Sequence, residues 1–300
     1  MSKTNTLFRF SFFAMGSPCE IQLYAQSQQQ ATQIAHMAIA DAERLEQRYS
    51  RYRPDSFLSH INRVAQAGGS VEVDEETAGL LNYANTCYLQ SDGLFDITSG
   101  LLRKAWNFSS GQIPDQSTID HVLEHVGWHK VVWDGVVIHF EVGMELDFGG
   151  IVKEYAADRL ATLCWNAGVH HGFVNLGGDI RVIGAQPSGE PWQIGIRHPR
   201  NKGELHRLEL HSGGVASSGD YERCMVVDGV LYGHILNPKT GWPVQHLAAV
   251  TVIADLCVVA GSASTMAMLQ QERGPELLAD LGLKHLWVDT QGSVGGTLGF

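Results

Sequence analysis

Glycine stands next to an acidic residue, or one residue away from it, in three segments: LDFGGIVKEYAADRL at 146–160, VNLGGDIRVIG at 174–184 and VASSGDYER at 215–223. In the first segment, Gly149 and Gly150 precede a helical pattern, so backbone amides at the helix N-terminus can face an anion. Asp147 can accept a hydrogen bond from a ligand N–H group, and Lys153 can contact a phosphate or a carbonyl oxygen. Alternatively, Asp147 caps the helix and Lys153 is a solvated surface charge; the segment alone leaves both interpretations open.

Two loops carry further candidate residues. In GHILNPKTGWPV at 233–244, His234 stands before a rigid Asn-Pro turn. A histidine placed in this way can act as a general base near neutral pH, or it can be a structural residue bonded to a loop carbonyl. In RYSRYRPDSFLSHIN at 48–62, Tyr52 can stack on a planar ring or pack beneath the Pro54 turn.

Several other kinds of chemistry are not indicated. The glycine segments contain neither a G-x-G-x-x-G dinucleotide fingerprint nor a P-loop, and no catalytic Cys–His, Ser–His–Asp or zinc spacing stands out. His121 and His125 have the i, i+4 spacing of metal ligands on a helix, and His170 adjoins His171. No third ligand occurs at a nearby spacing, so we expect these histidines to lie on the surface.

The hydrophobic pattern predicts a mixture of helices and hairpins. Helices are expected at 27–48, 75–90, 151–167, 258–272 and 275–281, β-structure throughout 172–254, a strand pair about an Asp-Gly turn at 130–140, and an interrupted extended segment at 7–24. Because strands and helices do not alternate strictly, the fold class is α+β and not a doubly wound parallel sheet. No low-complexity linker divides the chain, so residues 1–300 are expected to form one integrated domain.

Composition narrows the possible partners and the compartment. The 300 residues include 33 glycines and are 44% hydrophobic, with a formal net charge of −11. These values exclude disorder of the whole chain and disfavour binding to nucleic acid or an anionic membrane surface. No apolar run reaches the roughly 20 residues needed to span a bilayer. The five cysteines lie far apart without a C-x-x-C pair, which indicates reduced thiols.

The N-terminal stretch FRFSFFAMGSPC loosely resembles a signal that ends in a lipidated cysteine. Arg9 interrupts the apolar run, which is then too short for a signal, and Pro18 before Cys19 is an unfavourable cleavage context. A first strand with alternating phenylalanines is the preferred interpretation. We therefore expect a cytoplasmic protein.

Taken together, the motifs between about residues 12 and 270 resemble those of the ApbE family of flavin transferases, in the family's order. FAMGSPCEI resembles the opening A-M-G-T segment, YSRYRPDSFLSHIN resembles S-T-Y-R-P-x-S-x-[IL]-S-x-[IL]-N, and GLFDITSGLL resembles G-A-F-D-[IP]-T-V-G-P-L. LDFGGIVKEYAADRL resembles L-D-L-G-G-I-A-K-G-Y-A-[VA]-D, and VNLGGDIRVIG, ASSGDYER and HILNPKTGWPV complete the series. The resemblance implies a fold of duplicated T-fold-like β-β-α-α-β-β units with a flavin cleft between them.

The resemblance also implies an activity, that of an FAD:protein FMN transferase. FAD is split at its pyrophosphate, FMN is attached by a phosphoester bond to a Thr or Ser hydroxyl of a partner protein, and AMP leaves. His234 would be the base that takes the proton from the attacking hydroxyl. The cofactor-binding residues carried over by motif are Met15, Tyr52, Leu94, Phe95, Asp96, Asp147, Lys153 and Leu236. The chain lacks an acceptor string of the D-G-x-[ST]-G-A-[ST] type, so the acceptor is expected to be a separate protein.

The sequence departs from the family at the expected Mg²⁺ site. The family's late helix reads A-D-A-[LW]-[SD]-T, whereas this chain has VVAGSASTMAM, with Gly261 at the position of the aspartate. The metal candidates that remain are Ser264, Thr265 and the backbone carbonyl of Gly150. Mg²⁺ is usually held by one or two carboxylates, so Gly261→Asp is expected to raise Mg²⁺ affinity and activity together.

Other carboxylates leave alternatives open at this site. Asp179, Asp220 or Asp255 is a possible replacement ligand, and Asn237 stands where the family has an aspartate. Two further functions remain as alternatives to the transferase. One is a non-catalytic or impaired FAD-binding protein, and the other is an FAD hydrolase that yields FMN and AMP.

Overall fold

The structure is a computed structural model that describes residues 5–299. The chain begins with a hairpin of β1 (Thr6–Ala14) and β2 (Ser17–Ala25), which pair antiparallel. The interruption expected within 7–24 is the hairpin turn itself, where Met15 and Gly16 have φ values of 51° and 71°. Glycine adopts such positive values without strain, whereas a side chain as large as that of Met15 seldom does.

The hairpin opens the first of two units with the same order of elements. After it come α1 (Gln28–Tyr49), α5 (Val152–Asn166), β6 (Gly172–Leu176) and β7 (Asp179–Gly184), which give the order β-β-α-α-β-β. In α1 the side chain of Ser27 caps the N-terminus by accepting a hydrogen bond from the Gln30 amide at 3.2 Å. Residues at helical spacing, including Ile34, Ala38, Ala42 and Leu45, are buried along one face.

The second unit repeats this order. It consists of β10 (Gly213–Gly219), β13 (Leu247–Ala254), α6 (Cys257–Gln270), α7 (Gly274–Asp280), β14 (Lys284–Asp289) and β15 (Val294–Gly296). Both units share one sheet with the strand order β1-β2-β6-β7-β10-β13-β14-β15, because β7 pairs with β10. The α+β class and the duplicated units predicted from the sequence are therefore confirmed.

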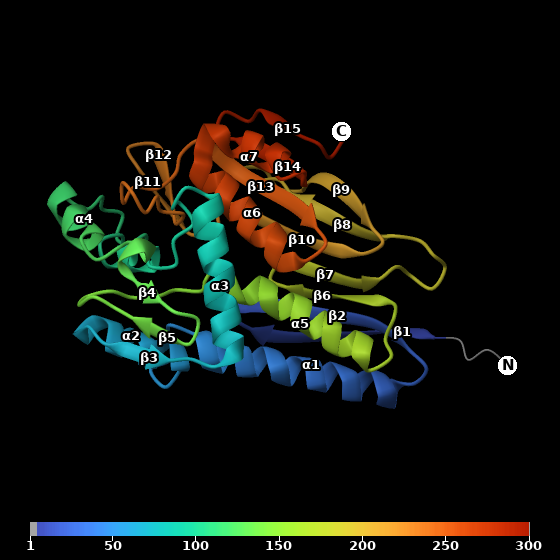
Figure 1. Ribbon diagram of the computed structural model, residues 1–300. Coiled ribbons are helices and arrows are strands. Elements are labelled where there is room, and N and C mark those ends of the chain that lie inside the picture. Colours follow the sequence, from blue (N-terminus) through green and yellow to red (C-terminus); the bar gives the residue numbers. More distant parts are fainter. Residues whose placement is uncertain (1–4, 300) are drawn as a thin grey trace.

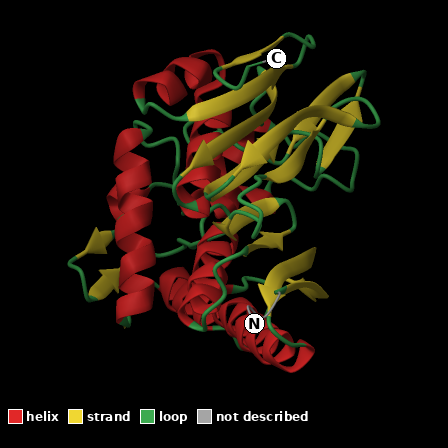
Figure 2. Ribbon diagram, turned by 90° about the vertical axis from the view of Figure 1, so that its right-hand side faces the viewer, coloured by secondary structure: helices red, strands yellow, loops and turns green. Residues whose placement is uncertain are grey.

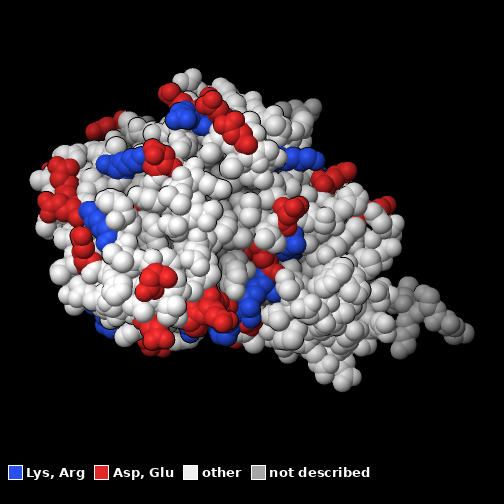
Figure 3. Space-filling model, in the orientation of Figure 1, with Lys and Arg blue, Asp and Glu red and all other residues white. Residues whose placement is uncertain are grey.

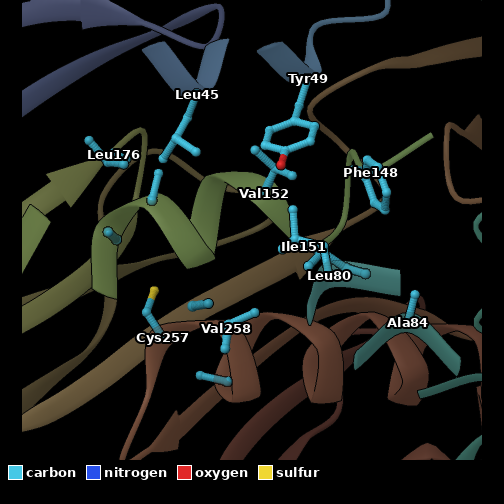
Figure 4. Close-up of a cluster of buried hydrophobic side chains, with 14 of the residues drawn as sticks. Leu45, Tyr49, Leu80, Ala84, Phe148, Ile151, Val152, Leu176, Cys257 and Val258 are labelled. Carbon is cyan, nitrogen blue, oxygen red and sulfur yellow. The ribbon is translucent and has the colours of Figure 1, made fainter. Parts of the chain in front are cut away.

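Figures 1 and 2 show the helices α1, α5 and α6 gathered on one side of this sheet. The opposite face is covered by the hairpin β8 (Trp192–Arg197) and β9 (Glu204–Leu210), whose Trp192 and Ile196 pack on Val182 and Val215. On the helical side, the start of α5 is surrounded by apolar side chains, as Figure 4 shows for Tyr49, Phe148 and Val258. The first turn of α5 therefore lies deep between the two units.

Helices α5 and α6 are also joined through a buried carboxylate. Asp158 of α5 accepts hydrogen bonds from the amides of Cys257 and Val258, at 2.8 and 2.9 Å, and so caps α6. Helix α6 is rich in Ala, Ser and Gly, and small residues allow two helix backbones to approach closely. The cap and the small side chains together fix how α6 lies against α5.

Two insertions interrupt the units. Between α1 and α5 lie α2 (Phe57–Ala67), β3 (Ser70–Glu72), α3 (Glu75–Gln90), α4 (Gln116–Leu123), β4 (Val132–Trp133), β5 (Val137–His139), and the 3₁₀ turns η1 (Ser99–Lys104) and η2 (Trp128–Lys130). The pairing of β4 with β5 confirms the strand pair expected at 130–140. Between β10 and β13 lies the hairpin of β11 (Cys224–Val227) and β12 (Val230–Gly233), and a third 3₁₀ turn, η3 (Gln271–Arg273), joins α6 to α7.

The predicted long helices are all present, with ends within a few residues of those expected. His121 is exposed and its ring lies edge-on to that of His125, with centroids 5.9 Å apart. Within residues 5–299, no group of three or more His, Cys, Asp and Glu side chains could hold a metal ion. In the same range, no helix is long and apolar enough to cross a membrane.

Candidate active site

The predicted site lies at the N-terminus of α5, which is approached by the β1–β2 turn, the β6–β7 turn and the loop at 91–100. The Nζ atom of Lys153 lies 2.7 Å from Oδ2 of Asp179 at the start of β7. The β6–β7 turn approaches the β1–β2 turn so closely that a Cβ atom on Gly177 would lie 2.6 Å from Cβ of Ser17. Gly177 also has a φ of 63°, so this turn requires glycine on two grounds. Lys153 is therefore an ion-paired residue inside the fold, and not a solvated surface charge.

Burial disfavours the charge on Lys153, but the carboxylate of Asp179 outweighs burial and holds the Lys153 pKa above its ordinary value. Lys153 is consequently positive at neutral pH. Gly149 and Gly150 lie directly before α5, where positive charge of the helix dipole adds to that of the lysine. The arrangement can neutralise an anionic group such as a phosphate.

The loop at 91–100 lies against this helix start. The amide of Asp147 donates to the carbonyl of Ile97 at 2.8 Å, and the ring of Phe95 would lie 3.4 Å from a Cβ atom on Gly150. Leu94 and Phe95 are both buried. Predicted residues from two distant segments are thus brought side by side.

Asp96 serves the architecture of that loop. Its Oδ1 accepts hydrogen bonds from the amide and the hydroxyl of Thr98, at 2.8 and 2.7 Å, and its Oδ2 accepts from the amide of Trp128 at 2.8 Å. The side chain is buried. Asp96 therefore joins the 91–100 loop to the turn at Trp128 and positions Phe95.

Asp147 has two partners. Its Oδ1 accepts from the Gly149 amide at 3.0 Å, and its Oδ2 forms an ion pair with Arg51. The guanidinium of Arg51 also lies over the ring of Tyr52, 4.9 Å from its centroid, and donates to the Tyr52 hydroxyl at 2.9 Å. Tyr52 is 70% exposed, so its ring is available to a ligand and is not packed beneath the turn.

Tyr52 also connects the first unit to the second. Its hydroxyl accepts a hydrogen bond from Arg223, at 3.4 Å, in the turn between β10 and β11. His234 directly follows β12, and its side chain is accessible to solvent. Desolvation by surrounding protein atoms, followed by the positive charge of Arg223, lowers the His234 pKa from its ordinary value. The imidazole is therefore neutral at pH 7, as a general base must be.

The loop after His234 is closed by hydrogen bonds. Leu236 forms an isolated β-bridge with Pro243, and the side-chain oxygen of Asn237 accepts from the amides of Lys239 and Thr240 at 2.8 and 3.3 Å. An Asn oxygen fills this role as an Asp oxygen would. Asn237 therefore preserves the turn although the family pattern has aspartate there.

The predicted metal residues on α6 also lie near this helix start. The hydroxyl of Ser218 at the end of β10 contacts the hydroxyls of Ser264 and Thr265, at 2.8 and 3.0 Å. Ser264 in turn donates to the carbonyl of Gly261 at 2.9 Å. Met15, in the β1–β2 turn, donates its amide to Oε2 of Glu46 at 2.9 Å.

Sequence reasoning missed three charged residues at the site. Arg51 and Arg223 lie within quoted motifs but were not singled out, and only the folded structure brings both to the Tyr52 hydroxyl. The third is Glu154 of α5, which is buried and whose Oε2 has no hydrogen-bond partner. Burial, followed by the negative charge of Asp179, raises the pKa of Glu154 above its ordinary value. The signal for Glu154 was its place in the K-E-Y sequence, where the family pattern has K-G-Y.

Two β-β-α-α-β-β units that meet at a lysine-bearing helix start give the chain the fold of the flavin transferases. It superimposes on the ApbE protein of Thermotoga maritima with a TM-score of 0.89 and 32% identity, covering 98% of this chain and 97% of that one. The ApbE flavinyl transferase of Pseudomonas stutzeri gives a TM-score of 0.88 with 28% identity, over 99% and 96% of the two chains. The ApbE family model matches residues 15–287, and the chain belongs to this family.

Curated relatives carry the name FAD:protein FMN transferase. The Klebsiella pneumoniae protein is 30% identical over 258 residues, which are 83% of this chain and 78% of that protein. The Rhodobacter capsulatus protein is 27% identical over 296 residues, or 96% of this chain, but the chain spans only 56% of the length of that relative.

Proposed function

We propose that the protein is an FAD:protein FMN transferase. The observation that carries the proposal is that motif segments from both units converge on the start of α5: the 91–100 loop, residues 146–153, the β6–β7 turn and the end of β10. Relatives with that name and the shared fold support the same function. FAD is the substrate, and the released product is AMP.

The chain's own residues divide into three tasks. Lys153 and the positive end of the α5 dipole bind the pyrophosphate, since the lysine ammonium has three N–H donors and its pair with Asp179 uses only one of them. The side chains of Met15, Tyr52, Leu94, Phe95 and Leu236 bind the rings, while Asp147, held by Arg51, accepts from a ligand N–H group. His234 takes the proton from the attacking hydroxyl because it is accessible and neutral.

In the reaction, the acceptor oxygen forms a bond to the phosphorus of the FMN moiety, and the bond from that phosphorus to the oxygen of AMP breaks. Phosphoryl transfer of this kind depends on positioning and on neutralisation of charge. Mg²⁺, when bound, would neutralise charge on the phosphoryl oxygens. The fit for such an ion is good, because the Thr265 and Ser264 hydroxyls and the Gly150 carbonyl are hard oxygen donors near an unpartnered buried carboxylate oxygen.

The acceptor is proposed to be a separate protein with a D-G-x-[ST]-G-A-[ST]-like motif, since this chain has none. We further propose that the enzyme is cytoplasmic, because its five cysteines are free thiols and four of them are buried. The shared eight-stranded sheet supports one integrated domain over residues 1–300.

The test is incubation with FAD, Mg²⁺ and an acceptor peptide, followed by mass spectrometry of the peptide and chromatography of the nucleotides. A gain equal to one FMN phosphoester, with AMP released in equal amount, is expected. The matched control peptide has alanine in place of the acceptor Thr or Ser and should gain nothing. AMP and FMN formed without acceptor would show hydrolysis instead, and unchanged FAD at high Mg²⁺ would contradict both reactions.

A further inference from the structure

The side chain of Glu154 fills the space beside Gly261. A Cβ atom on Gly261 would lie 2.5 Å from Cγ, 2.9 Å from Oε1 and 3.0 Å from Cδ of Glu154. A carboxyl carbon at residue 261 would lie one carbon–carbon bond, about 1.5 Å, beyond that Cβ atom. The Glu154 carboxylate therefore occupies the region that an aspartate at residue 261 would enter.

Two of the departures from the family pattern, Glu154 and Gly261, are reciprocal. Where the pattern has glycine in K-G-Y, this chain has Glu154, and where the pattern has aspartate in A-D-A, it has Gly261. The structure shows why these changes accompany each other, since either side chain would exclude the other. One carboxylate is retained at the same place but is carried by α5 and not by α6.

We propose that Glu154 is the carboxylate ligand of a hard divalent cation, Mg²⁺ or Mn²⁺, and replaces the missing aspartate of α6. This inference rests on the proposed function, because it is the FMN-transfer reaction that implies a divalent cation such as Mg²⁺.

Burial of Glu154 supports a bound cation. The side chain is 7% exposed and its Oε2 has no hydrogen-bond partner. Asp179 adds negative charge nearby, and Lys153, whose positive charge also acts on Glu154, is paired with Asp179 at 2.7 Å. A buried carboxylate without a partner is costly, and coordination of a metal ion removes that cost.

The surrounding oxygen atoms suit a magnesium-like ion. Thr265 follows Gly261 by four residues on α6, so it lies on the face of α6 that Gly261 presents to the Glu154 carboxylate. Gly150 precedes Glu154 by four residues, and Ser218 contacts the Thr265 hydroxyl. One carboxylate, hydroxyls and a carbonyl leave positions for water and for substrate phosphate, as Mg²⁺ requires.

Other carboxylates are less suitable. Asp220 is held by Arg200 through two hydrogen bonds of 2.6 Å, and Asp255 is exposed at the far end of β13. Asp179 already balances the charge of Lys153. Glu154 is thus the best-placed carboxylate without a cation of its own.

The experiment measures Mn²⁺ binding by the loss of the free-ion EPR signal, with and without FAD, and so does not depend on turnover. Four proteins are compared: the wild type, Glu154→Gln, the reciprocal variant Glu154→Gly with Gly261→Asp, and Glu75→Gln as control. Glu75 lies in the first turn of α3, as Glu154 lies in the first turn of α5, but it is exposed. Flavin fluorescence measures FAD affinity without metal, and circular dichroism checks folding.

Glu154→Gln is expected to weaken Mn²⁺ binding at least about tenfold while metal-free FAD affinity is unchanged. The reciprocal variant should restore Mn²⁺ affinity to within about threefold of the wild type, and Glu75→Gln should match the wild type. Wild-type Mn²⁺ affinity in Glu154→Gln would overturn the proposal, even if the reciprocal variant failed to fold. Metal binding that follows this pattern without FMN transfer would overturn the proposed function alone.

Discussion

Gly261 on α6 lies so close to Glu154 on α5 that a Cβ atom added to Gly261 would be only 2.5 Å from Cγ of Glu154. Any side chain at residue 261 would therefore meet the side chain of Glu154. The sequence alone suggested that Gly261→Asp would restore a lost metal ligand. The structure corrects that expectation, because the space is already filled by a carboxylate. Adding a second one without removing Glu154 would bring two negative charges together in a buried place.

Gly261→Asp alone is therefore expected to lower the free energy of unfolding by about 3 kcal/mol, through overpacking and an unpaired buried charge. Denaturant unfolding without metal measures this. Gly79→Asp is the control, because Gly79 is also helical but a Cβ atom there meets nothing within 4 Å. The control should stay within about 0.5 kcal/mol of the wild type. Equal stability of the two variants would show that Glu154 moves aside at little cost.

Arg51→Met is expected to weaken FAD binding about tenfold. The substitution removes the ion pair that holds Asp147, and a half-buried carboxylate without its partner costs about 1–3 kcal/mol. Fluorescence titration with FAD measures the change. Arg53→Met removes an exposed pair with Asp55 at 3.6 Å in the same loop and should leave FAD affinity unchanged. An equal loss in both variants would indicate a general effect of positive charge.

Asn237 allows a test of the turn that follows His234. Asn237→Asp should leave FMN transfer within about twofold of the wild type, because the acceptor oxygen for the Lys239 and Thr240 amides remains. Asn237→Ala removes that oxygen, and we expect it to lower stability by about 1 kcal/mol and to reduce turnover more than FAD binding. If Asn237→Asp were much more active than the wild type, the family aspartate would have a chemical role beyond the turn.

The sequence predicted the helices well because their apolar residues recur at helical spacing, as in α1 and α3. It also singled out the segments that the structure brings together at the candidate site, since each carries glycine or a turn signal. It could not predict the pairing of Arg51 with Asp147, which are separated by 96 positions. Nor could it show that Glu154 lies against Gly261, because that contact depends on how two helices from different units pack. The sequence shows Glu154 and Gly261 as separate departures from the family motifs, but not that the side chain of one fills the space beside the other.

His234 gives the pH dependence of transfer a definite sign. Its pKa is lowered by desolvation and by Arg223, so the neutral base persists below the ordinary histidine value of about 6.5. The rate constant kcat/KM should therefore be level near pH 7 and fall only as pH decreases through the lowered pKa.

Arg223→Gln tests the cause of that shift. Removing the positive charge should raise the His234 pKa, so the acidic limb of the kcat/KM profile should move to higher pH. FAD binding can also weaken, because Arg223 contacts the Tyr52 hydroxyl, but a change in affinity alone does not move the limb. His234→Ala should lower kcat by about 10²–10⁴ and abolish the limb, with FAD affinity retained. An acidic limb that persists unchanged in His234→Ala would assign the titration, and the base, to another group.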